Sequence, residues 1–471
     1  MTQLQAIRFA ELKNRLRGEV ILRNGDAYES ARKVWNATID KHPAVIVRCS
    51  TTSDVVHAVN FARNSGIMLA VRGGGHNIAG NALCDDGIVI DLSQMRAASV
   101  DPGARRVTIE GGATLADLDA ATQAHGLATP VGINSTTGVA GLTLGGGFGW
   151  LSRKYGMTID NLESAEVVTA AGKVVRASAR EHPDLFWALR GGGGNFGVVT
   201  RFEFRLHPVG PDVLSGLIVY PLSEAKSVLQ KYRDFAAKAP DELSVWALLR
   251  QAPPLPFLPR ESHGTGIVAL ALLYAGIPKL GQLFLEPLRK FGTVVGEHVG
   301  VQPYTNWQKA FDPLLAAGAR NYWKSHNLST LSDGLFDAVI EYLGKLPSPQ
   351  CEIFIGALGG AASRPAPDAA AYPHRDAQFV MNVHGRWEKP ADDARCIGWA
   401  RGFFNASAPF ASGGVYVNFL TADEGDRVPA AYGSNYDRLA RVKREYDPDN
   451  LFRMNQNIKP SGECVMRRTS N

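Results

Sequence analysis

A histidine at the end of a glycine run is the residue of this sequence whose type and position point most clearly to chemistry. His76 follows the glycines at positions 73–75, and these come after Arg72 and the apolar stretch 67–71. Glycines in series let backbone N–H groups approach a phosphate closely, because no Cβ stands in the way. A lone loop histidine more often bonds a backbone carbonyl. The residues alone therefore leave two interpretations open, a structural loop and a cofactor loop.

This loop differs from the dinucleotide fingerprint of Rossmann folds. That fingerprint carries G-x-G-x-x-G and leads from a strand into a helix. Here G-G-G-H leads instead into a second apolar run, residues 88–92, which reads as another strand. The Rossmann interpretation is therefore excluded.

Two further glycine clusters follow along the chain. Residues 131–156 interleave glycines with large apolar side chains, whereas a flexible linker would be polar and rich in serine. This cluster is therefore expected to be buried close to something flat or anionic. Residues 184–204 run from a short helical segment through RGGGGNFG into a strand that begins at Val198.

The elements around the first glycine run predict a β-α-β unit. Residues 43–49 form a short β-branched strand, Thr52 is expected to be the N-cap of a helix, and Gly66 lies beyond its end. Residues 67–71 return as a strand. The loop that carries His76 is thus expected at the carboxyl end of a strand.

The next segments predict further strands and a helix. Residues 106–109 read as a strand, and Thr114 with Asp117 forms a capping box for a helix that Gly126 ends. Residues 165–177 then read as a hairpin.

The pattern of the sequence changes after PVGP at 208–211. Strand-like runs alternate with amphipathic helices such as residues 223–238, and few tight glycine loops remain. This pattern predicts an antiparallel sheet with helices on one face, which would cover the site and hold the substrate. The strand-like runs are residues 215–222, 243–250, 266–274, 351–358 and 379–387.

Composition sets bounds on the class of protein. The 471 residues, 45% hydrophobic and 20% charged, are those of a globular protein with two or three domains. The net charge of +5 is spread along the chain, which argues against a nucleic-acid partner. The N-terminus has no continuous apolar core and no stretch reaches transmembrane length, so a cytoplasmic protein without a membrane partner is expected.

Cysteine and histidine spacing indicates no metal site. The five cysteines are odd in number, far apart and never in C-x-x-C, and the eleven histidines include no H-E-x-x-H. Neither a disulfide framework nor a zinc site is expected.

The string R-G-G-G-H-N at 72–77 resembles the FAD-binding domain of the vanillyl-alcohol oxidase superfamily, and within it the berberine bridge enzyme-like oxidases. Further matching strings are Y-G-x-x-x-D-N at 155–161, W-x-x-R-G-G-G at 187–193 and N-Q-N-I at 455–458. The resemblance covers nearly the whole chain.

The resemblance implies an α+β fold with two kinds of domain. The first is a two-part FAD-binding domain of the vanillyl-alcohol oxidase/p-cresol methylhydroxylase type, expected at residues 1–208 and 414–471. The second is a substrate domain with an antiparallel sheet and helices on one face, expected at residues 209–413.

The resemblance also implies an FAD-linked oxidase or dehydrogenase. In the family this histidine is bonded to the flavin 8α-methyl carbon, flavin N5 takes a hydride from a small alcohol, amine or sugar-like metabolite, and O2 is the usual acceptor. The residues implied to contact FAD are Arg72, Gly73, Gly74, Gly75, His76, Asn77, Gly138, Gly141, Gly145, Gly146, Gly147, Gly149, Gly193, Gly194, Asn195, Gly197, Val198, Val199, Asn455 and Asn457.

Two departures from the family pattern bear on the chemistry. Many members have a cysteine bonded to flavin C6, and here Asn134 stands in its place, so one attachment, through His76, is expected. Members that oxidise alcohols use a tyrosine base where this chain has Phe419, and a Gln or Glu base where it has Asn382. The remaining candidates for catalysis are Glu352 and Tyr416.

Glu352 lies on an apolar strand, where a glutamate is either exposed at an edge or desolvated with a raised pKa. Tyr416 is either a catalytic residue or an aromatic side chain with a purely structural, packed position. The resemblance on the substrate side implies that the substrate is contacted by Tyr322, Lys324, Arg375, Asn382 and Phe419. For the charged residues among them, the alternative is a solvated position in a loop. Two other functions stay open: a single-histidine flavin monooxygenase, and a flavin-carrying sensor without turnover.

Overall fold

In the computed structural model, which describes residue 9 and residues 11–462, the first glycine loop leaves a small mixed sheet. Its strand order is β1 (Glu19–Leu22), β2 (Val45–Arg48), β4 (Ile88–Asp91) and β3 (Leu69–Arg72). Strand β4 lies between β2 and β3 and is parallel to both. Helix α3 (Thr52–Ser65) connects β2 to β3, so the β-α-β unit forms with β4 inserted at its centre.

The expected N-cap of α3 was wrong by one residue. Thr51 caps the helix: its side chain accepts from the Asp54 backbone N–H. The Asp54 carboxylate accepts from the Thr51 backbone N–H, which completes a capping box. The three-residue spacing to Asp54 selects Thr51 over Thr52, because a cap side chain reaches the N–H of the third helical residue. Gly66 ends the helix in the left-handed region, as expected.

A second sheet has five antiparallel strands. Its order is β5 (Ala98–Asp101), β6 (Arg106–Glu110), β10 (Val198–Arg205), β8 (Leu162–Val168) and β9 (Val174–Ser178). Strands β8 and β9 form the predicted hairpin. Helix α4 (Leu115–Gln123) carries the predicted Thr114–Asp117 capping box but ends before Gly126. Helix α7 (Pro183–Leu189) precedes the third glycine cluster.

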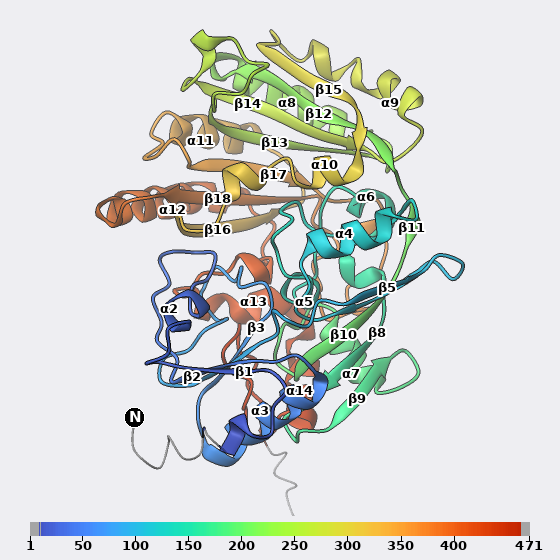
Figure 1. Ribbon diagram of the computed structural model, residues 1–471. Coiled ribbons are helices and arrows are strands. Elements are labelled where there is room, and N and C mark those ends of the chain that lie inside the picture. Colours follow the sequence, from blue (N-terminus) through green and yellow to red (C-terminus); the bar gives the residue numbers. More distant parts are fainter. Residues whose placement is uncertain (1–8, 10, 463–471) are drawn as a thin grey trace, which may run out of the picture.

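The largest sheet has seven antiparallel strands and occupies the upper part of the view (Figure 1). Its order is β15 (Gly296–Pro303), β12 (Asp212–Pro221), β14 (Gly266–Tyr274), β13 (Leu243–Gln251), β17 (Glu352–Ala357), β18 (Phe379–Trp387) and β16 (Arg320–Leu328). Five of these strands were predicted. The other two, β15 and β16, escaped prediction because their sequences, GEHVGVQP and RNYWKSHNL, are polar.

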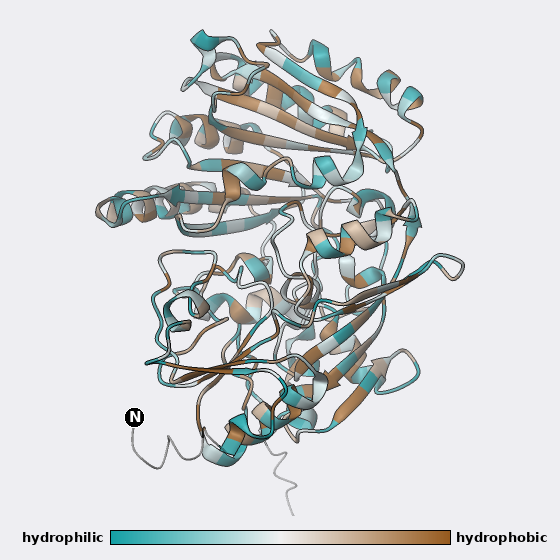
Figure 2. Ribbon diagram, in the orientation of Figure 1, coloured by the Kyte–Doolittle hydropathy of each residue, from teal (hydrophilic) through white to brown (hydrophobic). Residues whose placement is uncertain are grey.

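Helices cover one face of this sheet. Helix α8 (Ala225–Ala236) packs on β12 and β14, and α12 (Asp393–Ser407) packs on β16 and β18. Helix α11 (Asp333–Leu343) lies between them, and α9 (Pro278–Leu285) flanks β12. Hydrophobic residues follow the central strands (Figure 2). Nearly every residue of β13 and β14 is buried, so both faces of the sheet are covered.

The second glycine cluster packs on the opposite face of the large sheet. Trp150 contacts Trp246 of β13 with 4.5 Å between ring centroids, and Phe148 joins the same apolar cluster. The glycine loops and the sheet therefore face each other across a shared interior.

The C-terminal segment returns to the third glycine cluster. Helix α14 (Tyr436–Tyr446) packs on α7, and its buried Lys443 ammonium donates to the Asn195 carbonyl oxygen at 2.8 Å. The Asn195 side chain in turn accepts from the Ile458 N–H at 2.9 Å. These contacts fix the chain end against the loop.

The remaining α-helices and strands are short: α2 (Tyr28–Ala31), β7 (Leu127–Ala128), α5 (Val139–Leu144), α6 (Ser152–Tyr155), β11 (His207–Pro208), α10 (Tyr304–Gln308) and α13 (Val428–Tyr432). Within residue 9 and residues 11–462, no helix has the length and hydropathy needed to cross a bilayer. The four cysteines of that part carry free thiols, and Cys464 lies outside the described residues.

Candidate active site

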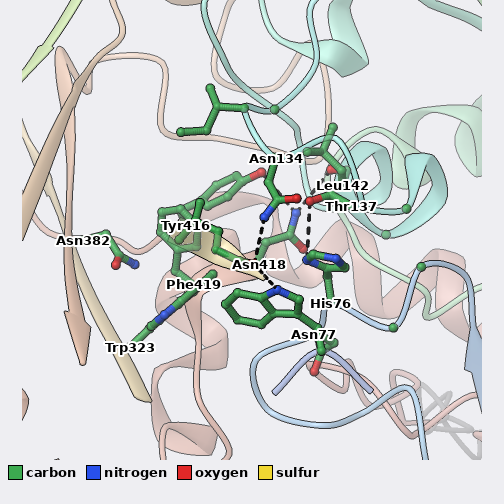
Figure 3. A pocket seen from close by; sticks show the side chains of 18 of the residues that line it. His76, Asn77, Asn134, Thr137, Leu142, Trp323, Asn382, Tyr416, Asn418 and Phe419 are labelled. Atoms are coloured by element: carbon green, nitrogen blue, oxygen red, sulfur yellow. Dashed lines mark hydrogen bonds between the residues drawn. The ribbon is translucent and has the colours of Figure 1, made fainter. Parts of the chain in front are cut away.

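A cavity of about 370 Å³ lies between the glycine loops and the large sheet. All three glycine clusters contribute to one wall, and side chains from β12, β13, β14, β16, β17 and β18 form the other. Figure 3 shows His76 and Asn134 on one side, with Asn382, Trp323 and Phe419 on the other. The described residues contain no group of three or more His, Cys, Asp or Glu side chains able to hold a metal.

His76 is held at the cavity by its neighbours. Its Nε2 lies 2.9 Å from Thr136 Oγ1, and its Nδ1 lies 3.5 Å from Thr137 Oγ1. The Trp35 ring stacks on the imidazole with centroids 5.2 Å apart. Burial lowers the pKa of His76 to about 4, so the ring is neutral at physiological pH.

The hydrogen-bond network fixes the tautomer of His76. The Thr136 hydroxyl donates to Asn134 Oδ1 at 2.7 Å, so its oxygen is left to accept from His76 Nε2–H. The proton of the neutral ring is thus on Nε2. The nitrogen that keeps a lone pair is Nδ1, beside Thr137.

The glycines of this wall have two distinct uses. A Cβ on Gly74 would lie 2.3 Å from the Gly138 backbone nitrogen, so the first two loops can touch only without side chains. At Gly141 and Gly194, by contrast, a Cβ would meet nothing within 4 Å, because both positions face open cavity. One pair closes the wall and the other leaves room for a ligand.

Most of the residues predicted to contact FAD line this cavity. They are Gly73, Gly74, Gly75, His76, Asn77, Gly138, Gly141, Gly193, Gly194, Gly197, Val198, Val199 and Asn455. The ones that lie outside its wall are Arg72, Gly145, Gly146, Gly147, Gly149, Asn195 and Asn457.

The residues outside the wall support the loops. The Arg72 guanidinium donates to the Ala31 carbonyl. Asn195 bridges the third loop to the C-terminal segment through the Gly192 and Gln456 carbonyls. The Gly147 N–H donates to the Tyr416 hydroxyl at 3.0 Å.

Three charged or polar side chains form a row across the large sheet. Arg250 on β13 pairs in register with Glu352 on β17, and Glu352 pairs with His384 on β18. Arg250 Nη1 donates to Glu352 Oε2 at 2.6 Å, and His384 Nδ1 lies 3.4 Å from Glu352 Oε1. All three line the cavity and are at most 9% exposed.

Neither of the two alternatives given for Glu352, an exposed edge position or a raised pKa, describes it. Burial acts to raise it, but the Arg250 charge and the His384 hydrogen bond outweigh burial and hold the pKa at about 2. Glu352 is therefore a fully ionised carboxylate inside the cavity wall, neither edge-exposed nor protonated.

Tyr416 also lines the cavity, but its pKa is raised, whereas that of Glu352 is lowered. Burial raises its pKa to about 12, although hydrogen bonds from Asn418 and Gly147 act to lower it. Its oxygen accepts from the Asn418 amide at 3.1 Å and from the Gly147 N–H. At physiological pH the phenol keeps its proton.

Phe419 lines the cavity and is surrounded by aromatic rings. Its ring centroid is 4.9 Å from Tyr416, 5.3 Å from Trp323 and 6.0 Å from Phe354, each edge to face. This cluster makes an apolar patch beside the charged row.

The residues predicted to contact substrate separate into two groups. Asn382 lines the cavity at 1% exposure, and neither atom of its amide has a hydrogen-bond partner. Tyr322, Lys324 and Arg375 lie outside the wall and are paired elsewhere. Tyr322 and Lys324 bond Asp423, at 2.6 and 3.4 Å. Arg375 forms a bidentate pair with Asp160 at 2.8 Å. Lys324 and Arg375 thus form ion pairs, and Tyr322 donates a hydrogen bond to the same carboxylate as Lys324.

Sequence reasoning missed five residues of the site: Trp35, Thr136, Arg250, Trp323 and His384. For one of them a signal was present. His384 lies two residues after Asn382 on the same strand, and side chains at that spacing share a face. For Arg250 and Trp35 no local pattern distinguishes them from ordinary surface or core residues.

Comparisons with known proteins agree on one family. Residues 43–178 match the family model described as FAD binding domain, and residues 415–459 match the one described as berberine and berberine like. An FAD-linked oxidoreductase of Dictyostelium discoideum is 31% identical over 94% of this chain and 95% of its own.

Two named oxidases are also similar. The (R)-6-hydroxynicotine oxidase of Paenarthrobacter nicotinovorans is 30% identical over 95% of this chain and 98% of its own. The solved structure of a xylooligosaccharide oxidase from Myceliophthora thermophila, in complex with xylobiose, has a TM-score of 0.84 at 26% identity. It covers 97% of this chain and 100% of that one.

Proposed function

This chain belongs to the berberine bridge enzyme-like FAD-linked oxidoreductases, and from that membership we propose a specific reaction for it. It oxidises a C–H bond of a small alcohol, amine or sugar-like molecule, with FAD attached through His76 and O2 as the final acceptor. The observation that carries the proposal is the neutral His76, which lines a cavity whose opposite wall bears Glu352 and Asn382.

The glycine wall suits FAD. Positions 141 and 194 face open cavity, and the loops offer backbone in place of side chains, as a pyrophosphate and a flat ring need. When bound, FAD supplies the chemistry by accepting a hydride at N5. The residues that would hold it are the cavity-lining members of the three loops, together with Asn455.

His76 is suited to a covalent bond. A bond from imidazole to a carbon needs an unprotonated nitrogen, and the lowered pKa keeps the ring neutral. Because Nε2–H donates to Thr136, we propose Nδ1 as the atom that is attached.

A single attachment follows from the surroundings of Asn134. Its amide accepts from Thr136 and lies beside the Leu315 carbonyl, and no thioether can form from an amide. The described cysteines, Cys49, Cys84, Cys351 and Cys396, are buried and none lines the cavity.

We also propose the domain boundaries given by the sequence. Residues 1–208 and 414–471 would hold FAD, and residues 209–413 would supply the substrate wall. The large sheet, β12 to β18, falls within the second range.

The function is tested by an anaerobic screen of alcohols, amines and oligosaccharides against the purified protein. Bleaching of the flavin absorbance band at about 450 nm by one class of compound supports oxidation of that class. If no compound of the three classes bleaches the flavin, the proposal fails in favour of a sensor without turnover. Incorporation of labelled oxygen from O2 into the product would favour a monooxygenase.

A further inference from the structure

Helix α9 presents an apolar face to solvent near strand β15, at one edge of the large sheet (Figure 1). Among the described residues, six large hydrophobic side chains are exposed, and four of them lie on α9 or at its N-cap. These are Ile277, Leu280, Leu283 and Phe284, which are between 37% and 70% exposed. Clustered apolar side chains on a soluble protein mark an interaction site, and none of these four lines the cavity.

The inner face of α9 is fixed to the sheet. Gly281 and Leu285 are buried, and a Cβ at position 281 would lie 2.6 Å from the Tyr274 ring of β14. The Phe284 ring stacks on the same tyrosine with centroids 5.8 Å apart. The helix therefore cannot turn its apolar face inward without losing these contacts.

Two opposite charges flank the apolar face on the same side of the helix. The three exposed apolar residues within α9 are spaced i, i+3 and i+4, so they form one stripe. Lys279 and Glu286 are seven residues apart, which is about two turns, so they lie along one border of that stripe. Glu286 pairs with Arg289 at 2.8 Å and its side chain is still 58% exposed. Lys279 is exposed and forms no ion pair with any described residue.

The order of these charges is unfavourable for an isolated helix. Lys279 is in the first turn, where the macrodipole favours an acidic residue, and Glu286 is the C-cap, where it favours a basic one. Helices α3 and α14 have the favourable order, with an acidic residue in the first turn and a basic residue in the last. An antiparallel helix of the same sequence would bring a carboxylate to Lys279 and an ammonium to Glu286, which offsets both disadvantages.

We infer that α9 is the contact surface for a second copy of this chain. Two α9 helices pack antiparallel about a two-fold axis, with Lys279 of each protomer opposite Glu286 of the partner subunit, so the ion pair forms twice. Leu280, Leu283 and Phe284 lie between the two charges in the sequence, so the same axis brings the two stripes together. A contact centred on one short helix is smaller than a standard interface, so the dimer is weak and depends on protein concentration.

A lipid surface is less suited to this face. Helices that lie on membranes carry several Lys or Arg residues on their polar side. The segment 277–286 has one cation, Lys279, and one anion, Glu286, so it has no net charge to attract anionic headgroups. Opposite charges at a fixed spacing suit a copy of the same helix.

The first experiment measures the mass of the purified full-length protein by sedimentation over a range of micromolar concentrations. The wild type should shift with concentration from the monomer, with 50.8 kDa of polypeptide, toward twice that mass. Leu283→Glu, at an exposed position, should remain monomeric with an unchanged melting temperature. Val174→Glu on β9 is the matched control, because Val174 is also an exposed hydrophobic residue, and it should associate like the wild type. A wild type that stays monomeric, or a Leu283→Glu variant that still dimerises, would overturn the proposal.

The second experiment exchanges the charges. Lys279→Glu and Glu286→Lys should each raise the dissociation constant of the dimer by about tenfold, because each replaces two attractive contacts by two repulsive ones. Both substitutions improve the charge order of the helix, so a weaker dimer cannot be due to an unfolded α9. Lys279→Glu/Glu286→Lys should associate more tightly than either single variant, and a double variant no tighter than these would overturn the antiparallel pairing. Binding of the wild type, but not of Leu283→Glu, to phosphatidylcholine–phosphatidylserine vesicles would assign the face to a membrane and overturn the proposed dimer.

Discussion

The two walls of the cavity are made of different parts of the protein. The glycine wall presents backbone, and its residues lie within three short, contiguous segments. The sheet wall presents side chains, and its charged row joins residues 102 and 32 positions apart. A backbone wall suits a constant ligand, whereas a wall of exchangeable side chains can be adapted to different substrates without changing the fold.

The strongest disruption should come from the point where two glycine loops touch. In Gly74→Ala the new Cβ would overlap the Gly138 backbone, so the loops must separate and the cavity wall opens. We expect loss of most folded, flavin-containing protein, measured by soluble yield and by the ratio of flavin to protein absorbance. Gly398→Ala on α12, where a Cβ meets nothing, is the control and should change stability by less than about 1 kcal/mol.

Removing the proposed attachment point tests the backbone wall without disturbing it. In His76→Ala the loops keep their shape, so FAD should still bind but only reversibly. Acid-precipitated wild-type protein should be yellow with the mass of FAD on a His76 peptide, and the variant precipitate should be colourless. An FAD adduct on a cysteine peptide would contradict the role assigned to Asn134.

The sheet wall should be sensitive to the amide that has no partner. Asn382→Leu removes a donor and an acceptor that are free to meet a substrate, and leaves no protein group unpaired. We expect the KM for the substrate found by screening to rise about tenfold, with FAD content and melting temperature unchanged. Unchanged kinetics would place Asn382 outside substrate recognition.

Tyr416 lies where the two walls meet, and its loss should affect stability more than rate. Tyr416→Phe leaves the Gly147 N–H without its acceptor, which costs about 1–3 kcal/mol of unfolding free energy. Flavin reduction should stay within about threefold of wild type, because a phenol with a pKa near 12 is a poor proton acceptor. A large loss of rate without loss of stability would restore Tyr416 as a base.

The smallest expected effect is a dependence of stability on acid. Glu352 has a pKa of about 2 when folded against 4.5 as its ordinary value, so its contribution is present above pH 4.5 and is lost as pH falls toward 2. Thermal melting of wild type and Arg250→Met/Glu352→Gln at pH 6 and pH 3 measures it. The wild type should lose more stability on acidification than the variant, and equal losses would show that Glu352 is not ion-paired.

The two walls also differ in how much of their structure could be predicted from the sequence. Local patterns gave the strands around the glycine loops, the Thr114–Asp117 capping box and five strands of the large sheet, because periodicity and capping depend on near neighbours. Strand β16 was missed because its buried Asn321 and Lys324 look like surface residues until their partners are known.

The electrostatic character of the site could not be predicted in the same way. The sequence places Glu352 on an apolar strand, and desolvation alone would raise its pKa. Arg250 and His384, which belong to two other strands, reverse the direction of the pKa shift, so that the Glu352 pKa is lowered. Charge on a sheet face is set by register, and register is a property of the folded sheet.

The ties from Lys443 and Ile458 to Asn195 have a consequence for the order of events during synthesis. The third glycine loop emerges from the ribosome some 250 residues before its partners, as the separation of 248 between Lys443 and Asn195 requires. At about 5–20 residues per second, the loop waits for tens of seconds without them. The proposed attachment of FAD is therefore expected only after residue 443 has been synthesised, and a nascent chain halted before residue 443 should remain colourless.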